Sequence, residues 1–161
     1  KVRAIVLSNF YDARFIDLVE NMEVKPAVVQ LETHVFSQQR KMRELMAPYG
    51  TRLMAWAPLA EGQHGIFTNP TLAEIATKHG KSVAQVALRF LMHEDIITIP
   101  KSVRRERQLE NLSIEDFELT QEEIEVIRAL DGGKPLMADF NNPELARFLL
   151  EYDSKFNPDR R

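Results

Sequence analysis

The run Arg52–Leu59, RLMAWAPL, is almost continuously apolar, which is typical of a strand in the interior of a protein. Three further runs have the same character. They are RAIVLSNF (Arg3–Phe10), PAVVQLE (Pro26–Glu32) and DIITIP (Asp95–Pro100). A strand with one exposed face would alternate apolar and polar residues, so we expect these four strands to be buried on both faces.

Amphipathic helical patterns follow each of these runs along the chain. The expected helix signals are, in chain order, Asp12 and Ser37 as N-caps, Asn69–Pro70 as a cap with proline after it, Gly80 as a stop, and Ser82–Gln85 and Thr120–Glu123 as capping boxes. The chain therefore repeats a strand–helix unit four times. Such a repeat predicts an α/β fold with a parallel sheet and right-handed crossovers.

Two architectures satisfy this repeat. One is an open doubly wound sheet, whose dinucleotide-binding form needs a G-x-G-x-x-G fingerprint, and this sequence has none. The other is a (β/α)8 barrel, which takes about 250 residues when complete. The sequence therefore predicts a half-barrel of four βα units. We expect a single domain over residues 1–161, with the half-barrel at 1–130 and a C-terminal tail at 131–161.

Composition excludes several classes of partner and chemistry. The 161 residues have a formal net charge of −3 and no cysteine. A mildly acidic chain argues against nucleic acid or a membrane surface as its partner, and no apolar run reaches the roughly 20 residues that span a bilayer. The histidines show no metal-ligand spacing. We expect a cytoplasmic protein without a metal, and the start at Lys1 indicates a segment of a longer protein.

One stretch goes against the acidic balance: IPKSVRRERQLEN, residues 99–111, carries four cations. They are Lys101, Arg104, Arg105 and Arg107. A charge run of this kind is often only a solvated surface. At the start of a helix, however, cations oppose the helix dipole by up to about 1 kcal/mol each. An anionic ligand would offset that cost.

The ordered set of strand ends resembles the C-terminal half of an aldo-keto reductase, which is strands 5–8 of a (β/α)8 barrel. The motifs are SNF (Ser8–Phe10), VVQLETH (Val28–His34), AWAPLAEG (Ala55–Gly62) and IPKSVRRERQLEN. Trp56, where tyrosine is commoner, and NNPEL (141–145) resemble the bacterial diketogluconate-reductase-like members. The family is one of NADPH-dependent oxidoreductases that reduce aldehydes and ketones to alcohols.

The resemblance implies a cofactor-binding role for ten residues. The nicotinamide carboxamide would be bound by Ser8, Asn9 and Gln30, and Trp56 would stack under the nicotinamide ring. Leu59 would belong to the loop over the pyrophosphate. The 2′-phosphate and the adenine would be bound by Lys101, Ser102, Arg107, Glu110 and Asn111. Uncharged amides and a hydroxyl suit the first role, and an arginine fork with a lysine suits the phosphate. Ala60 replaces the family's usual loop glycine.

The same resemblance implies that no catalytic residue lies on this chain, because the family's Asp, Tyr, Lys and His belong to the first four strands. We expect a small-molecule carbonyl substrate, a missing N-terminal half and an isolated segment without activity. The alternative is a non-catalytic half-barrel that binds NADP(H) or phosphate and is completed by self-association. A third interpretation, an unrelated enzyme with Lys101 as a Schiff-base lysine, is disfavoured by the arginines that follow it.

Overall fold

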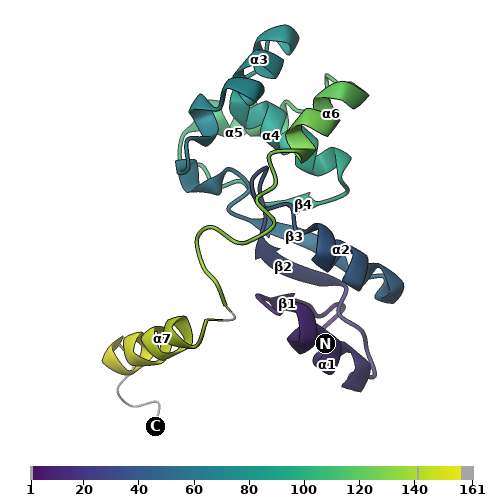
Figure 1. The fold of residues 1–161 in the computed structure, drawn as a ribbon, viewed down its shortest axis with the longest axis vertical. Helices are drawn as coiled ribbons and strands as arrows, with labels where there is room; N and C mark the ends of the chain where they lie inside the picture. The colour runs from purple at the N-terminus through teal and green to yellow at the C-terminus, as the bar shows by residue number, and fades with distance from the viewer. Residues whose placement is uncertain (1, 141, 157–161) are drawn as a thin grey trace.

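The computed structural model describes residues 2–140 and 142–156, and its centre is a parallel four-stranded sheet (Figure 1). The strands are β1 (Val6–Ser8), β2 (Val28–Glu32), β3 (Arg52–Trp56) and β4 (Ile97–Thr98). They lie in chain order, and every neighbouring pair is parallel. The prediction of an α/β fold with a parallel sheet is confirmed. Of the expected tail, Asn141 and residues 157–161 lie outside the described residues.

Helices connect and follow the strands. They are α1 (Asp12–Asn21), α2 (Arg40–Met46), α3 (Pro70–His79), α4 (Val83–His93), α5 (Arg105–Leu112), α6 (Gln121–Arg128) and α7 (Pro143–Phe156), with single 3-10 turns η1 (Ala47–Tyr49), η2 (Ala60–Gly62) and η3 (Ile66–Thr68). In Figure 1, α7 lies apart from the sheet, at the end of an extended segment that follows α6.

Most of the predicted helix signals are confirmed. Asn69 accepts a hydrogen bond from the Leu72 N–H at the start of α3, and Gly80 ends that helix in the left-handed conformation. Both capping boxes are present, at the starts of α4 and α6.

Two predicted caps are wrong. Asp12 is the first residue inside α1, and Tyr11 occupies the N-cap position without a side-chain bond. Ser37 pairs with His34 in a tight bridge, so that α2 begins only after Gln39. Tertiary contacts accompany both helix starts: the Asp12 N–H contacts the Met42 sulfur at 3.1 Å, and the Gln38 N–H donates to Asp131 Oδ1 at 3.0 Å.

The sheet is covered by helices on one face only, which corrects the expectation of strands buried on both faces. Leu7, Val29, Leu31, Leu53 and Ala55 on the covered face are at most 9% exposed and form the core. On the other face Glu32 is fully buried, but the other alternate residues keep contact with solvent. They are Val6, Ser8, Val28, Gln30, Met54, Trp56 and Ile97. This face is nevertheless rich in apolar side chains, which is why the sequence did not alternate.

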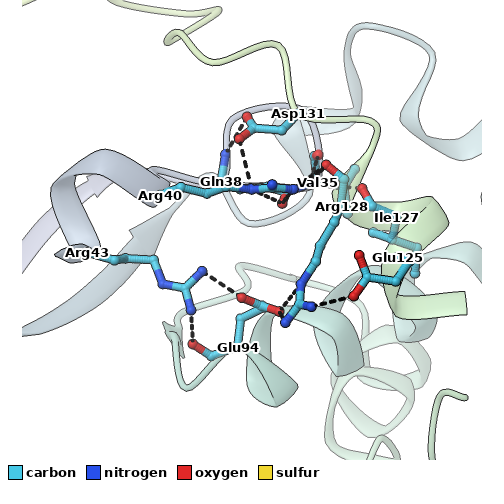
Figure 2. A network of polar contacts seen from close by, with 9 residues as sticks. All are labelled: Val35, Gln38, Arg40, Arg43, Glu94, Glu125, Ile127, Arg128 and Asp131. Atoms are coloured by element: carbon cyan, nitrogen blue, oxygen red, sulfur yellow. Dashed lines mark hydrogen bonds and ion pairs between the residues drawn. The ribbon is translucent and has the colours of Figure 1, made fainter. Parts of the chain in front are cut away.

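An ion-pair network around the buried Glu94 carboxylate joins α2, α4 and α6 (Figure 2). Glu94, after α4, accepts hydrogen bonds from Arg43 of α2 at 2.6 Å and from Arg128 of α6 at 2.6 and 2.8 Å. Close by, the Gln38 side chain donates to the carbonyl oxygens of Val35 and Ile127 at 2.8 and 2.9 Å. The network fixes α6, and with it the start of the tail, against the loop after β2.

Candidate functional site

The polar residues at the carboxyl ends of the first three strands lie together on the uncovered face. Ser8 and Gln30 are direct partners in the β1–β2 register. The Asn9 N–H donates to the Gln30 carbonyl oxygen at 2.9 Å, and the Trp56 indole Nε1–H donates to Asn9 Oδ1 at 2.9 Å. Parallel strands bring their carboxyl ends to one edge, so this grouping follows from the fold.

Within this group, the side-chain amide of Gln30 lacks a strong partner in the described part of the chain. Its Nε2 contacts only the Met54 sulfur, at 3.5 Å, and a thioether is a weak acceptor. Asn9 adopts the left-handed conformation, with φ 59°, which places its side chain beside Trp56. The indole is therefore held in a fixed orientation, while an amide beside it remains able to bind a ligand.

A cavity of about 700 Å³ lies further along the same edge, between the loop after β3 and the start of α5. The lining includes every residue that the sequence assigned to the pyrophosphate, the 2′-phosphate and the adenine: Leu59, Lys101, Ser102, Arg107, Glu110 and Asn111. The four residues assigned to the nicotinamide, Ser8, Asn9, Gln30 and Trp56, are outside this lining. The structure thus divides the predicted residues into two sets. The sets are adjacent, because Trp56 of the first is bonded to Ala57, which lines the cavity of the second.

The basic residues of the cavity have no carboxylate partner in the part of the chain that the structure describes. Lys101 and Arg107 are exposed, and neither forms an ion pair within residues 2–140 and 142–156. They lie at the amino-terminal end of α5, whose N-cap residue, Arg104, provides no side-chain cap. The first backbone N–H groups of the helix therefore add partial positive charge beside the two cations. Such an arrangement favours an anion.

The loop after β3 reaches the cavity through an unusual backbone. Ala57, Ala60 and Glu61 have φ of 52°, 47° and 51°, in the left-handed region, where a side chain costs roughly 1–2 kcal/mol. Gly62 follows with φ 75°. Such strain persists only where surrounding structure enforces it, and it is common at ligand sites. Ala60 therefore holds, at a cost in strain, a left-handed conformation that glycine adopts freely.

Sequence reasoning missed other residues of this region. Phe67 lines the cavity as a half-exposed aromatic, and its loop position in GIFTNP was the signal that could have found it. Glu32 was treated only as part of a strand, although it is a fully buried carboxylate. In the part of the chain that the structure describes, no helix is long and apolar enough to cross a membrane, and no cluster of acidic or histidine side chains could hold a metal ion.

Comparison with known proteins matches residues 1–132 to the aldo/keto reductase family. Glyoxal reductase of Bacillus subtilis is 44% identical over 131 residues, which is 81% of this chain and 47% of that protein. A crystal structure of MGS-M4, an aldo-keto reductase from a Medee basin deep-sea metagenome library, superposes with a TM-score of 0.83 at 37% identity, over 88% of this chain and 53% of that one.

A structure of a Gox0644 mutant in complex with NADPH superposes with a TM-score of 0.82 at 32% identity, over 88% of this chain and 52% of that one. The parallel α/β fold and these matches relate the chain to the barrel-fold aldo-keto reductases. The chain belongs to the aldo/keto reductase family. It spans about half the length of the relatives that it matches. The narrower resemblance to diketogluconate-reductase-like members remains a prediction.

Proposed function

We propose that this chain is the NADPH-binding, C-terminal half of an aldo-keto reductase, and that its strands are strands 5–8 of the (β/α)8 barrel. The observation that carries the proposal is the cavity between the β3 loop and α5. It gathers Lys101, Ser102 and Arg107 with Glu110 and Asn111, and its two cations have no carboxylate partner among the described residues. A guanidinium fork beside an ammonium suits a phosphate monoester, which distinguishes NADPH from NADH.

The strand-end residues fit the other end of the cofactor. The indole of Trp56 offers a flat apolar surface whose orientation is set by the hydrogen bond to Asn9. The Gln30 amide offers donors and an acceptor without charge, which suits a carboxamide. When bound, NADPH supplies the hydride for carbonyl reduction. The residues of this chain bind and orient it, which is a positioning role rather than acid–base chemistry.

The uncovered sheet face supports a half-barrel. Val6 is 55% exposed there, and Val28, Met54 and Ile97 are partly exposed, although a barrel interior is normally packed. The outer edges of β1 and β4 have no further strand within the described residues. We infer that the N-terminal half covers this face and contributes the catalytic acid. The chain alone would then bind cofactor without reducing a carbonyl compound.

The same face supports the second candidate, a non-catalytic NADP(H)- or phosphate-binding half-barrel that pairs with a second copy. Unpaired strand edges and an apolar face favour association, and two copies would restore eight strands. Sedimentation of the chain separates the two accounts. A stable dimer without turnover favours the second candidate, and a monomer that gains carbonyl reductase activity when a matching N-terminal half is added favours the first.

Fluorescence of Trp56, the only tryptophan, tests the cofactor site directly. Titration with NADPH should quench it. Replacing Arg107 by alanine should weaken NADPH binding by about tenfold to a hundredfold, because hydrogen bonds to charged groups contribute about 1.5–3 kcal/mol. Arg105→Ala is the matched control, since Arg105 is an exposed cation of the same helix outside the cavity lining. Equal effects of the two substitutions would contradict the proposed 2′-phosphate site.

A further inference from the structure

The Glu32 carboxylate, at the end of β2, is fully buried and binds the backbone of the tail. It accepts hydrogen bonds from three consecutive N–H groups: Leu136 at 2.6 Å, Met137 at 3.1 and 3.0 Å, and Ala138 at 3.2 Å. Consecutive backbone N–H groups that converge in this way form a concave anion site. Here the anion is the protein's own side chain, from a residue more than a hundred positions earlier in the chain.

His34 completes the set of donors around this carboxylate. The Phe36 N–H donates to His34 Nδ1 at 3.2 Å, so Nδ1 keeps its lone pair and the proton lies on Nε2. Nε2 in turn lies 3.2 Å from Glu32 Oε1. The imidazole is therefore a neutral donor, and none of the groups described as binding this carboxylate is a cation. Burial alone would raise the pKa of Glu32, but the hydrogen bonds from His34 and the three amides outweigh burial and lower it.

The tail segment that begins with Leu136 is also held at Phe140, four residues further along the chain. The Phe140 ring stacks on Tyr11 with 6.5 Å between centroids, and the Phe140 carbonyl oxygen accepts from Arg14 Nη2 at 2.7 Å. Tyr11 follows Asn9 by two positions, and Glu32 follows Gln30 by two. Residues 136–140, which we call the strap, are therefore fixed to the ends of the two strands that carry the proposed carboxamide ligands.

We propose that Glu32 is a positioning residue that fixes the strap as a wall at the nicotinamide end of the site. The carboxylate acts through the tail backbone and does not itself contact the cofactor. Glu32 is the partner of Trp56 in the β2–β3 register, so it anchors the strap at the same strand ends as the ring proposed to stack on the nicotinamide. The location of the nicotinamide rests on the proposed function, whereas the anchoring of the strap by Glu32 does not.

Amide hydrogen exchange of the full chain, followed residue by residue by NMR, tests this anchor. In Glu32→Ala the amides of Leu136, Met137 and Ala138 should exchange at least about tenfold faster, because they lose a charged acceptor. Added formate should return these rates to within about twofold of the original values, since a small carboxylate can occupy the vacated anion site. Formate should leave the rates of the unsubstituted chain unchanged.

Glu123→Ala is the matched control, because Glu123 is also a buried carboxylate, which caps α6 and accepts a hydrogen bond from His79. In Glu123→Ala the strap amides should still exchange slowly relative to the other amides of the domain. If Glu32→Ala does not fold, Glu32→Gln replaces it. The glutamine fills the site and directs an NH2 group at backbone donors, so the strap amides should accelerate without rescue by formate.

Three results would overturn the proposal: strap amides that stay protected without Glu32, equal acceleration of all amides in the domain, or an alanine variant that formate does not rescue. None of these measurements uses NADPH. A failed anchor would therefore leave the cofactor site standing, and a failed NADPH titration would leave the anchor standing.

Discussion

Replacing Glu94 by glutamine should destabilise the fold by removing the charge that holds three helices together. The Glu94 side chain is 7% exposed, whereas those of Arg43 and Arg128 are 28% and 31% exposed. Glutamine keeps the volume, but it leaves two arginines facing a neutral group (Figure 2). The perturbation therefore isolates the electrostatic contribution from the packing contribution.

The expected magnitude follows from the burial of the partners. Breaking a buried ion pair typically costs about 3–5 kcal/mol, because one charge is left unpaired in the interior. Here water reaches both guanidinium groups, which lowers that cost, and glutamine still offers one acceptor oxygen. We therefore expect the free energy of unfolding to fall by about 2 kcal/mol.

Urea unfolding at neutral pH measures this loss. Glu118→Gln is the matched control, because Glu118 is 89% exposed and lies 3.8 Å from Arg89. An exposed pair of this kind contributes about 0–1 kcal/mol. The free energy of unfolding should fall with urea concentration at the same slope in both variants, so that only the midpoint of unfolding changes. If Glu94→Gln were no more destabilising than Glu118→Gln, the network would contribute nothing beyond surface charge, and the reasoning would be refuted.

Two further predictions concern stability. Burial by itself would raise the pKa of Glu94, but the hydrogen bonds from Arg43 and Arg128 outweigh burial and hold that pKa below the ordinary value of a glutamate. A carboxyl with a lowered folded-state pKa stabilises the fold fully above its unfolded-state pKa and loses that contribution as the pH falls. The free energy of unfolding should therefore fall below about pH 4.5, less steeply in Glu94→Gln, and identical acid profiles would contradict this assignment. Asn69→Ala removes the N-cap bond of α3 and should cost about 1 kcal/mol in urea unfolding; an unchanged midpoint would show that the cap contributes nothing.

The strand pattern could be predicted from sequence because it depends on local properties. Four apolar runs, each followed by a capped amphipathic helix, were enough to indicate a parallel α/β sheet. The capping boxes were equally local, since Ser82 and Gln85 satisfy one another's backbone within a single turn. Asp12 and Ser37 were misassigned because a cap also depends on where the preceding loop is held, and that is a tertiary property.

Residues of the candidate site that are close together in one sequence motif could be predicted. Residues that depend on contacts between distant segments were harder to predict. Lys101, Ser102 and Arg107 are close in sequence and line one cavity in the structure. Glu32 was not recognised, because its partners are backbone amides at 136–138, which carry no signature in the residue types. The uncovered face was misjudged for a related reason: an apolar strand looks the same whether its second face is packed or is left for another segment to cover.

Calorimetric titration of the chain with 2′,5′-ADP, set against 5′-AMP, tests the central claim most directly. All of the residues proposed to bind this fragment line one cavity, so the measurement needs this chain alone. A phosphate bound by Arg107 and Lys101 should make 2′,5′-ADP bind at least about tenfold more tightly than 5′-AMP. Equal affinities, or no binding of either nucleotide, would contradict the assignment of this cavity to the 2′-phosphate of NADPH.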